Sequence, residues 1–596
     1  MRSILFVPLL LALPSVAWAT QDADPTDEAP VDTSRAPLLP HRELSEALAR
    51  LASEHASNVQ LLSLVRKSRA GRSIDALRIT GAEHPSGQPA ILLVANIDGP
   101  LVYTSGIALE HAQRLARGYG NDEAVTRLLD TTTVYIIARA NPDAAEARFI
   151  SPLAEVRATG HDVDNDRDGR LGEDGPSDVN GDGFVSVMRV PDPDGTWMPD
   201  PTDPRVQVEA DPAKGERGLW KLVPEGRDSD GDEEASEDPP LDAIVNRNFA
   251  QDWKAHDASA GLFPSDEPEV RALYEFVLAH EDIQLVLVYG ELGNLVERGQ
   301  GVDDDAKLEK RVPPSGVRES DGAILDTIGE RYREITGDTT KGSQDEAGTF
   351  QAWCYEQRGI TTLNAALWSI PLDAEADSSE ADSSEADTEE VGTTKPEQSE
   401  EETETDEEKK EEEKDDEPKP SDDAKRMIWI DLNSEDARHL GWTAFDHPEL
   451  GPVEVGGFAP YALVEPPDED RVRIADKQFE FLLSLDATVA RVELEDVRVT
   501  ARGELLEVEA VLVNEGLLPL VTTWGKKTRT TLPARVEIHL PAGATLLAGS
   551  KRVLVSDLRG SGGRHELRWL VSGATAASIG ISVVTRHAGG ARAEVK

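Results

Sequence analysis

Apolar strand-like runs alternate with amphipathic helical patterns between residues 38 and 372. The runs cover residues 90–96, 133–138 and 283–288, and the helical patterns cover residues 106–117 and 267–280. Strands that alternate with helices indicate an α/β sheet, and nearly continuous apolar strands are typical of a sheet covered on both faces. The sequence therefore predicts an α/β domain over residues 38–372.

A second pattern begins close to Val492. Period-two strands cover residues 505–514, 534–540, 565–571 and 577–585, and glycine and proline separate them. Alternating strands with frequent turns are typical of two packed antiparallel sheets. We expect an all-β sandwich over residues 490–596.

An acidic low-complexity segment separates these regions. Residues 373–423 contain 25 acidic residues and five lysines, and the whole chain has a formal charge of −53. Such a segment cannot bury a core, so we expect residues 373–425 to be a disordered insertion. Ordered composition resumes at residues 426–470, which we assign to the end of the α/β domain. The net charge argues against nucleic acid as a partner.

The N-terminus has the order of a secretory signal: Met1-Arg2, an apolar stretch, and then Ala17-Trp18-Ala19. We expect residues 1–19 to be a signal peptide and residues 20–37 to be a flexible segment. This predicts export to the periplasm, the extracellular space or the cell surface. No later run is apolar enough to predict a transmembrane segment.

Several motifs occur in the order found in one enzyme family. They are Asn141-Pro142-Asp143, Asn246-Arg247-Asn248-Phe249, residues 263–269 and residues 348–360. Together they resemble the zinc carboxypeptidases, the carboxypeptidase A-like metallopeptidases, over residues 38–465. The resemblance implies a mixed sheet flanked by helices. It also implies that Asn246 and Arg247 bind a peptide's terminal carboxylate, which a planar guanidinium can hold through two parallel hydrogen bonds. The alternative is that this loop only packs the fold.

The residues at the family's catalytic positions differ from the family pattern. In that family a His, a Glu three residues later and a second His bind zinc, and another Glu is the general base. Here Asp98, Leu101 and either Tyr289 or Gly290 stand at the ligand positions, and Ala366 replaces the catalytic glutamate. Leucine cannot bind zinc and a methyl group cannot accept a proton. We therefore expect neither zinc binding nor hydrolysis by the family mechanism. The oxyanion arginine is not assigned, since Arg148 and Arg157 both lie in a divergent region.

Two loops in an insertion at residues 160–240 have the spacing of calcium-binding loops. Oxygen-bearing side chains occupy loop positions one, three and five, and glycine occupies position six. The candidate ligands are Asp164, Asp166 and Asp168 in the first loop and Asp178, Asn180 and Asp182 in the second. Neither loop has a glutamate at position twelve, so we expect modest affinity. Calcium is the cofactor that this pattern favours.

Three functions follow from these patterns. The first is a secreted carboxypeptidase-like pseudoenzyme that binds a peptide or protein C-terminus. The second is an active metallocarboxypeptidase or another hydrolase with relocated ligands, including Asp98 and Glu291. The third is a structural calcium-binding surface protein. The sequence carries no signal of oligomeric state.

Overall fold

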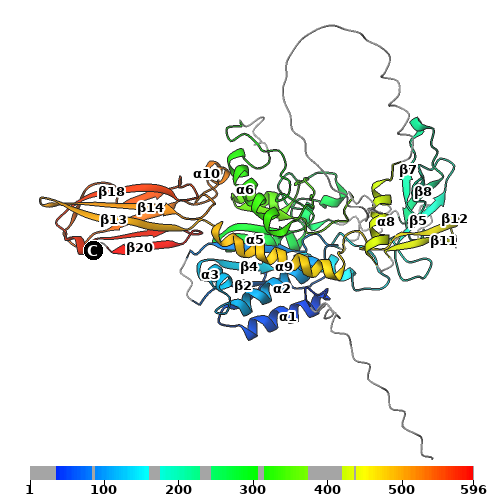
Figure 1. Cartoon of the computed structure of the whole chain (residues 1–596), viewed down its shortest axis with the longest axis horizontal. Coiled ribbons are helices and arrows are strands. Elements are labelled where there is room, and N and C mark those ends of the chain that lie inside the picture. The colour runs from blue at the N-terminus through cyan, green and yellow to red at the C-terminus, as the bar shows by residue number, and fades with distance from the viewer. Residues whose placement is uncertain are drawn as a thin grey trace, which may run out of the picture.

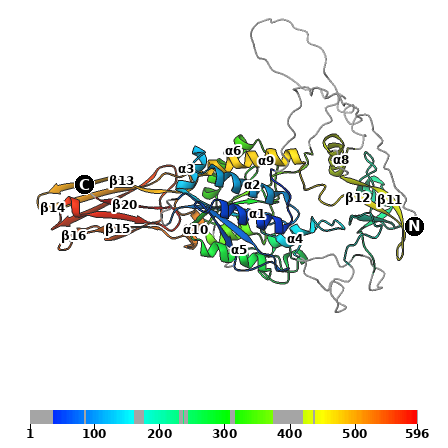
Figure 2. The same ribbon diagram turned by 90° about the horizontal axis from the view of Figure 1, so that it is seen from below.

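The computed structural model describes residues 35–82, 87–159, 175–228, 236, 243–306, 315–372, 419–434 and 438–594. Figure 1 shows an α/β domain in the middle, a β-sandwich at one end and a smaller sheet with helix α8 at the other, and Figure 2 shows the same order from below. The predicted α/β fold with a mixed sheet and a following β-sandwich is confirmed. The predicted signal peptide, residues 20–34 and residues 373–418 lie outside the described residues.

The main sheet has six strands in the order β1-β2-β4-β3-β9-β10. Strands β4, β3, β9 and β10 run parallel, whereas β1 and β2 are antiparallel to their neighbours. Every residue of β3, β4 and β9 is buried, as expected for strands covered on both faces. The bounds are β1 (Val59–Ser63), β2 (Asp75–Ile79), β3 (Ala90–Ala95), β4 (Thr133–Ile137), β9 (Ile283–Tyr289) and β10 (Thr361–Ala365).

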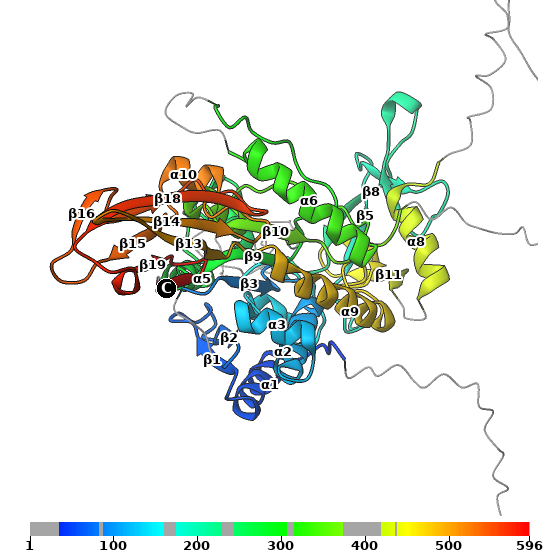
Figure 3. The same ribbon diagram turned by 60° about the vertical axis from the view of Figure 1, so that its left-hand side comes forward.

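Helices cover both faces of this sheet. Leu93 and Leu287 face a core formed with α2 and α9, and their neighbours Leu92 and Val286 face a core formed with α5 and α7. This alternation follows from the two-residue period of a strand. Figure 3 shows α9 between α6 and α2, in agreement with its contacts. The helices are α1 (His41–Glu54), α2 (Tyr103–Gly118), α3 (Glu123–Thr131), α4 (Pro142–Ala147), α5 (Pro268–Ala279), α6 (Glu319–Thr336), α7 (Phe350–Arg358) and α9 (Asp468–Ser484).

Three predicted boundaries need correction. Helix α8 (Asp422–Asn433) begins inside the range predicted to be disordered, because the Ser421 side chain caps it and Ala424 is buried. Helix α9 packs on α2 and α6, so the α/β domain continues past residue 470 to Ser484. The prediction that residues 20–37 are flexible is wrong for the last of these residues. Ala36 is fully buried, and Arg35 pairs with Glu110 and Asp476.

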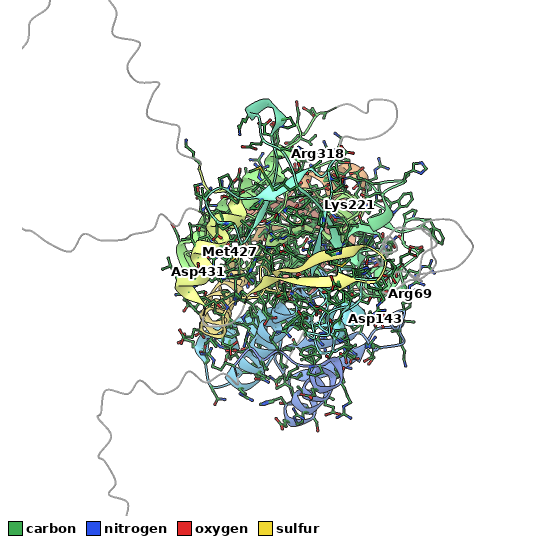
Figure 4. All side chains as sticks on the ribbon, turned by 90° about the vertical axis from the view of Figure 1, so that its right-hand side faces the viewer. Arg69, Asp143, Lys221, Arg318, Met427 and Asp431 are labelled. Atoms are coloured by element: carbon green, nitrogen blue, oxygen red, sulfur yellow. The ribbon has the colours of Figure 1, made fainter. Side chains whose placement is uncertain are left out.

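A second sheet was not predicted. Its order is β11-β12-β5-β8-β6-β7, so it joins the insertion after α4 to the segment that follows the acidic region. Figure 4 shows Met427 and Asp431 of α8 at the edge of this sheet, where Asp431 pairs with Arg205. The strands are β5 (Val187–Pro191), β6 (Trp197–Pro199), β7 (Gln207–Glu209), β8 (Trp220–Pro224), β11 (His439–His447) and β12 (Gly451–Phe458).

The C-terminal sandwich has two four-stranded sheets, β13-β14-β18-β16 and β17-β15-β19-β20. Helix α10 (Thr523–Thr528) docks it on the α/β domain: Trp524 lies under the Arg318 guanidinium at 4.2 Å, and its Nε1 donates to the Glu356 carbonyl at 2.7 Å. The strands are β13 (Val492–Arg502), β14 (Leu505–Asn514), β15 (Ala534–His539), β16 (Thr545–Ala548), β17 (Arg552–Val555), β18 (Gly563–Ser572), β19 (Gly580–Val584) and β20 (Gly590–Glu594). Among the helices that the structure describes, none is both long and apolar enough to cross a membrane.

Candidate functional site

The candidate site lies where β3, β9 and β10 end. Parallel strands place their carboxyl ends at one edge of a sheet, which is where open α/β sheets bind ligands. Asp98, Glu291 and Ala366 each follow one of these strands, and the 3-10 turn η2 (Val245–Arg247) brings Asn246 to the same edge. The structure thus gathers residues from four separate segments of the sequence.

Asp98 is buried, and both of its carboxylate oxygens accept hydrogen bonds. Asn246 Nδ2 donates to Oδ1 at 3.1 Å, and the Glu291 backbone N–H donates to Oδ2 at 2.8 Å. Burial raises the pKa of Asp98 to about 6, and the nearby Glu291 carboxylate acts in the same direction. Gly290 leaves room for this approach, because a Cβ there would lie 2.4 Å from Asp98 Oδ2.

The other residues at the expected zinc positions do not face Asp98 with a ligand atom. Leu101 is buried in the apolar core. Tyr289 is fully buried on the α2 side of the sheet, where its hydroxyl lies 3.4 Å from His111 Nδ1 and its ring meets that imidazole edge-on. Ala366 is half-buried after β10 and offers only a methyl group.

These residues do not fit a catalytic zinc ion. Such an ion takes three protein ligands and leaves one position open for water. Asp98 already uses both oxygens within the protein, and Leu101 supplies none. Over the described ranges of the chain, no group of three or more His, Cys, Asp and Glu side chains stands close enough to hold a metal ion.

Glu291 carries the second carboxylate of the site. Arg157 Nη1 donates to its Oε1 at 2.6 Å, and Arg157 also lies 3.5 Å from Glu155. Arg148 pairs instead with Glu465 at 2.9 Å. Of the two arginines left unassigned by the sequence, Arg157 is therefore the one that the fold brings to the site.

Asn246 and Arg247 make different kinds of contact. Asn246 is buried and uses both ends of its carboxamide, since its Oδ1 also accepts from the Phe350 N–H at 3.0 Å. Arg247 is partly exposed, with 26% of its side chain accessible, and its Nη1 donates to the Asp345 carbonyl at 2.8 Å. The sequence singled out neither Asp345 nor its second partner Lys254, because both lie in polar loops without a motif.

The first calcium-type loop, with Asp164, Asp166 and Asp168, lies outside the described residues. In the second loop the side chains bond to groups of the loop itself: Asp178 Oδ1 accepts from the Gly181 backbone N–H at 2.7 Å, and Asn180 Nδ2 donates to the Asp182 side chain at Oδ2 at 2.9 Å. Gly181 and Gly183 have φ angles of 77° and 92°, which glycine adopts without strain.

A buried glutamate that the sequence did not point to fastens this loop. Glu225 is fully buried, and its Oε1 accepts from the Val179 N–H at 2.9 Å. Its Oε2 accepts from both the backbone N–H and the hydroxyl of Ser186 at 2.9 Å. Glu225 thus holds both ends of the loop, a role that requires the strand pairing of β5 with β8.

Two parts of the chain match known protein families. The zinc carboxypeptidase family matches residues 44–170, which confirms the predicted resemblance, and a domain of unknown function, DUF8731, matches residues 491–596. Carboxypeptidase M of Mus musculus is 31% identical over 109 residues, which are 18% of this chain and 25% of that protein. Carboxypeptidase D of Anas platyrhynchos is 33% identical over 133 residues, which are 21% of this chain and 10% of that protein. The chain thus spans a quarter or less of these relatives.

Two solved structures each overlap with more than half of this chain. The crystal structure of thrombin activatable fibrinolysis inhibitor has a TM-score of 0.34 and 12% identity, covering 57% of this chain and 70% of that one. Carboxypeptidase A from Helicoverpa armigera has a TM-score of 0.34 and 15% identity, covering 57% of this chain and 68% of that one.

Proposed function

Because residues 44–170 match the zinc carboxypeptidase family, we propose that the chain is an exported, catalytically inactive relative of these enzymes that binds the carboxylate of a peptide C-terminus. The observation that carries this proposal is the hydrogen bonding of the Asp98 carboxylate. Its two oxygens are engaged by Asn246 and by the Glu291 backbone, so the site lacks a free metal ligand where the family has its first one.

Hydrolysis by the family mechanism needs an activated water and a general base. Ala366 removes the base, and the positions of Leu101 and Tyr289 remove two metal ligands. The losses act on separate parts of the mechanism, so no single neighbouring side chain compensates for them.

Carboxylate binding is supported by Arg247. Its guanidinium is partly exposed, its positive charge acts on the buried Asp98, and the contacts of Nη1 with the carbonyl groups of Asp345 and Ala347 fix its position. A guanidinium held in this way can pair with a carboxylate without first ordering its own long side chain.

An active hydrolase is the second candidate, and the Asp98 and Glu291 pair favours it. A buried carboxyl group with a pKa of about 6 can exchange a proton close to neutral pH, as a general acid or base must. The pairing of Glu291 with Arg157 at 2.6 Å opposes this candidate, because one oxygen of the Glu291 carboxylate is already engaged within the protein.

Calcium binding is a separate proposal for the loop of Asp178, Asn180 and Asp182. The two positive-φ glycines and the buried Glu225 give this loop the curvature that a calcium loop needs. Calcium would then stabilise the second sheet, which β5 enters directly after the loop.

The first experiment is the metal content of the purified mature protein, measured by mass spectrometry after chelation and return of zinc and calcium. We expect bound calcium and no stoichiometric zinc. One zinc per chain would refute the proposal that the protein is catalytically inactive and would require a test of peptidase activity. Calorimetry with C-terminal peptides then tests binding, and Arg247→Ala should abolish it.

A further inference from the structure

We propose that the Asp345 carboxylate is an internal ligand of the Arg247 site, and that Lys254 is a second cationic arm which contacts the carboxylate of a bound peptide. This inference rests on the proposed function and deepens it, because it names the residue that competes with the peptide and a further residue that binds it.

One oxygen atom carries both contacts. Asp345 Oδ2 lies 3.1 Å from Arg247 Nη1 and 2.8 Å from Lys254 Nζ. A carboxylate oxygen shared by two cations occupies a place where both cations attract a negative charge. The carboxylate of Asp345 therefore stands in for the carboxylate of a peptide.

The three side chains remain accessible to solvent. The exposed fractions are 26% for Arg247, 47% for Asp345 and 51% for Lys254. Ion pairs with this exposure are weak, so water and solutes can replace one partner without unfolding the site. A peptide carboxylate can therefore exchange with the side chain of Asp345.

The loop that carries Asp345 is fixed against the segment that carries Arg247. The Gly348 N–H donates to the Gln251 carbonyl at 2.7 Å, and the Gly348 carbonyl accepts from the Phe249 N–H at 2.8 Å. A Cβ on Gly348 would lie 2.2 Å from the Arg247 carbonyl oxygen, so only glycine permits this approach. On the other side, Gln344 Nε2 donates to the Gly293 carbonyl at 2.6 Å. The backbone thus holds Asp345 within reach of both cations.

Removing the charge of Asp345 should leave Arg247 in place. Arg247 Nη1 donates to the Asp345 backbone carbonyl at 2.8 Å, a contact that any residue at this position keeps. In Asp345→Asn, two cations face the ligand without an internal carboxylate. We expect this variant to bind a free peptide carboxylate about fivefold more tightly than the wild type. Lys254→Gln should bind it about threefold more weakly.

The test is calorimetry on the full chain with N-acetyl-Gly-Ala-Leu, which has a free terminal carboxylate, and with its C-terminal amide as the matched ligand. The variants are Asp345→Asn, Asp345→Ala, Lys254→Gln and Arg247→Gln. The control is Asp326→Asn, because Asp326 is also half-exposed, at 52%, and pairs with Arg298 at 2.9 Å away from Arg247 and Lys254.

The proposal is supported if both Asp345 variants bind the acid more tightly, Lys254→Gln binds it more weakly, and the control and the amide show no change. If the Asp345 variants bind no more tightly than the wild type while Arg247→Gln loses binding, this inference is wrong and the proposed function stands. If Arg247→Gln binds as the wild type does, the proposed carboxylate site itself is wrong. If the wild type and both Asp345 variants all fail to bind the acid, both proposals are overturned.

Discussion

Replacing Asp98 with asparagine should change the pH dependence of folding stability. Burial raises the pKa of Asp98 from 3.8 in the unfolded chain to about 6 in the folded one. The folded state thus binds the proton more tightly, and the stability from the protonated group is fully present below 3.8 and is lost as the pH rises through about 6. The full loss of unfolding free energy is about 3 kcal/mol, since each pKa unit of difference between the folded and unfolded chain corresponds to about 1.4 kcal/mol.

The variant removes this titration and keeps the shape of the side chain. Asparagine can accept only one of the two hydrogen bonds from Asn246 and Glu291, a cost of about 1–2 kcal/mol that does not depend on pH. We therefore expect the difference in unfolding free energy between variant and wild type to move by about 2.5 kcal/mol in favour of the variant from about pH 4 to about pH 8, which is most of the full effect.

The assay is urea-induced unfolding, followed by far-UV circular dichroism in chelator-treated buffers across this pH range. Asp326→Asn is the control, because hydrogen bonding to Arg298 lowers the pKa of Asp326 and its difference curve should move in the opposite direction. A flat difference curve for Asp98→Asn would contradict the raised pKa. A curve that favours the wild type at high pH would mean that the Asp98 anion is stabilised, as a bound metal ion would do, and would refute the proposed inactive site.

Three further predictions concern the surroundings of the site. Gly348→Ala should destabilise the protein by about 2 kcal/mol and weaken peptide binding, because its Cβ would lie 2.2 Å from the Arg247 carbonyl oxygen. The control is Gly337→Ala, at a similar φ of 67° but with no atom within 4 Å of the added Cβ. It should lower the unfolding free energy less in urea and leave binding intact. Trp524→Ala should cost about 3–5 kcal/mol and make the junction before the sandwich susceptible to limited proteolysis; equal protease resistance would contradict the docking role. Calcium at about a hundredfold above its Kd should stabilise the wild type by about 2.7 kcal/mol, and Asp178→Ala should lose that gain in calorimetric melts. If the wild type melts at the same temperature with and without calcium, the proposed calcium site is wrong.

The sequence alone determined the two main fold classes. The buried strands β3, β4 and β9 are almost wholly apolar because helices cover both faces, and this pattern can be read without a structure. The alternating strands of the sandwich are equally direct, because one face of each sheet meets the other sheet. Motif order also predicted a resemblance to the zinc carboxypeptidases, and residues 44–170 match that family.

The tertiary structure decided how the site residues meet. Whether Tyr289 or Gly290 faces Asp98 depends on which face of the sheet the Tyr289 side chain occupies, and only the packing of Tyr289 against His111 settles that question. The contact of Asp345 with Arg247 likewise joins two polar loops whose sequences predict no pairing.

The strand pairing of the second sheet was likewise decided by the tertiary structure. Its β5 and β12 come from segments on either side of the acidic region, where Arg189 of β5 pairs with Glu454 of β12. Local periodicity records what a residue's own strand or helix buries. It carries no information about a partner from a distant segment, because that partner is chosen by packing and hydrogen bonding in the folded chain.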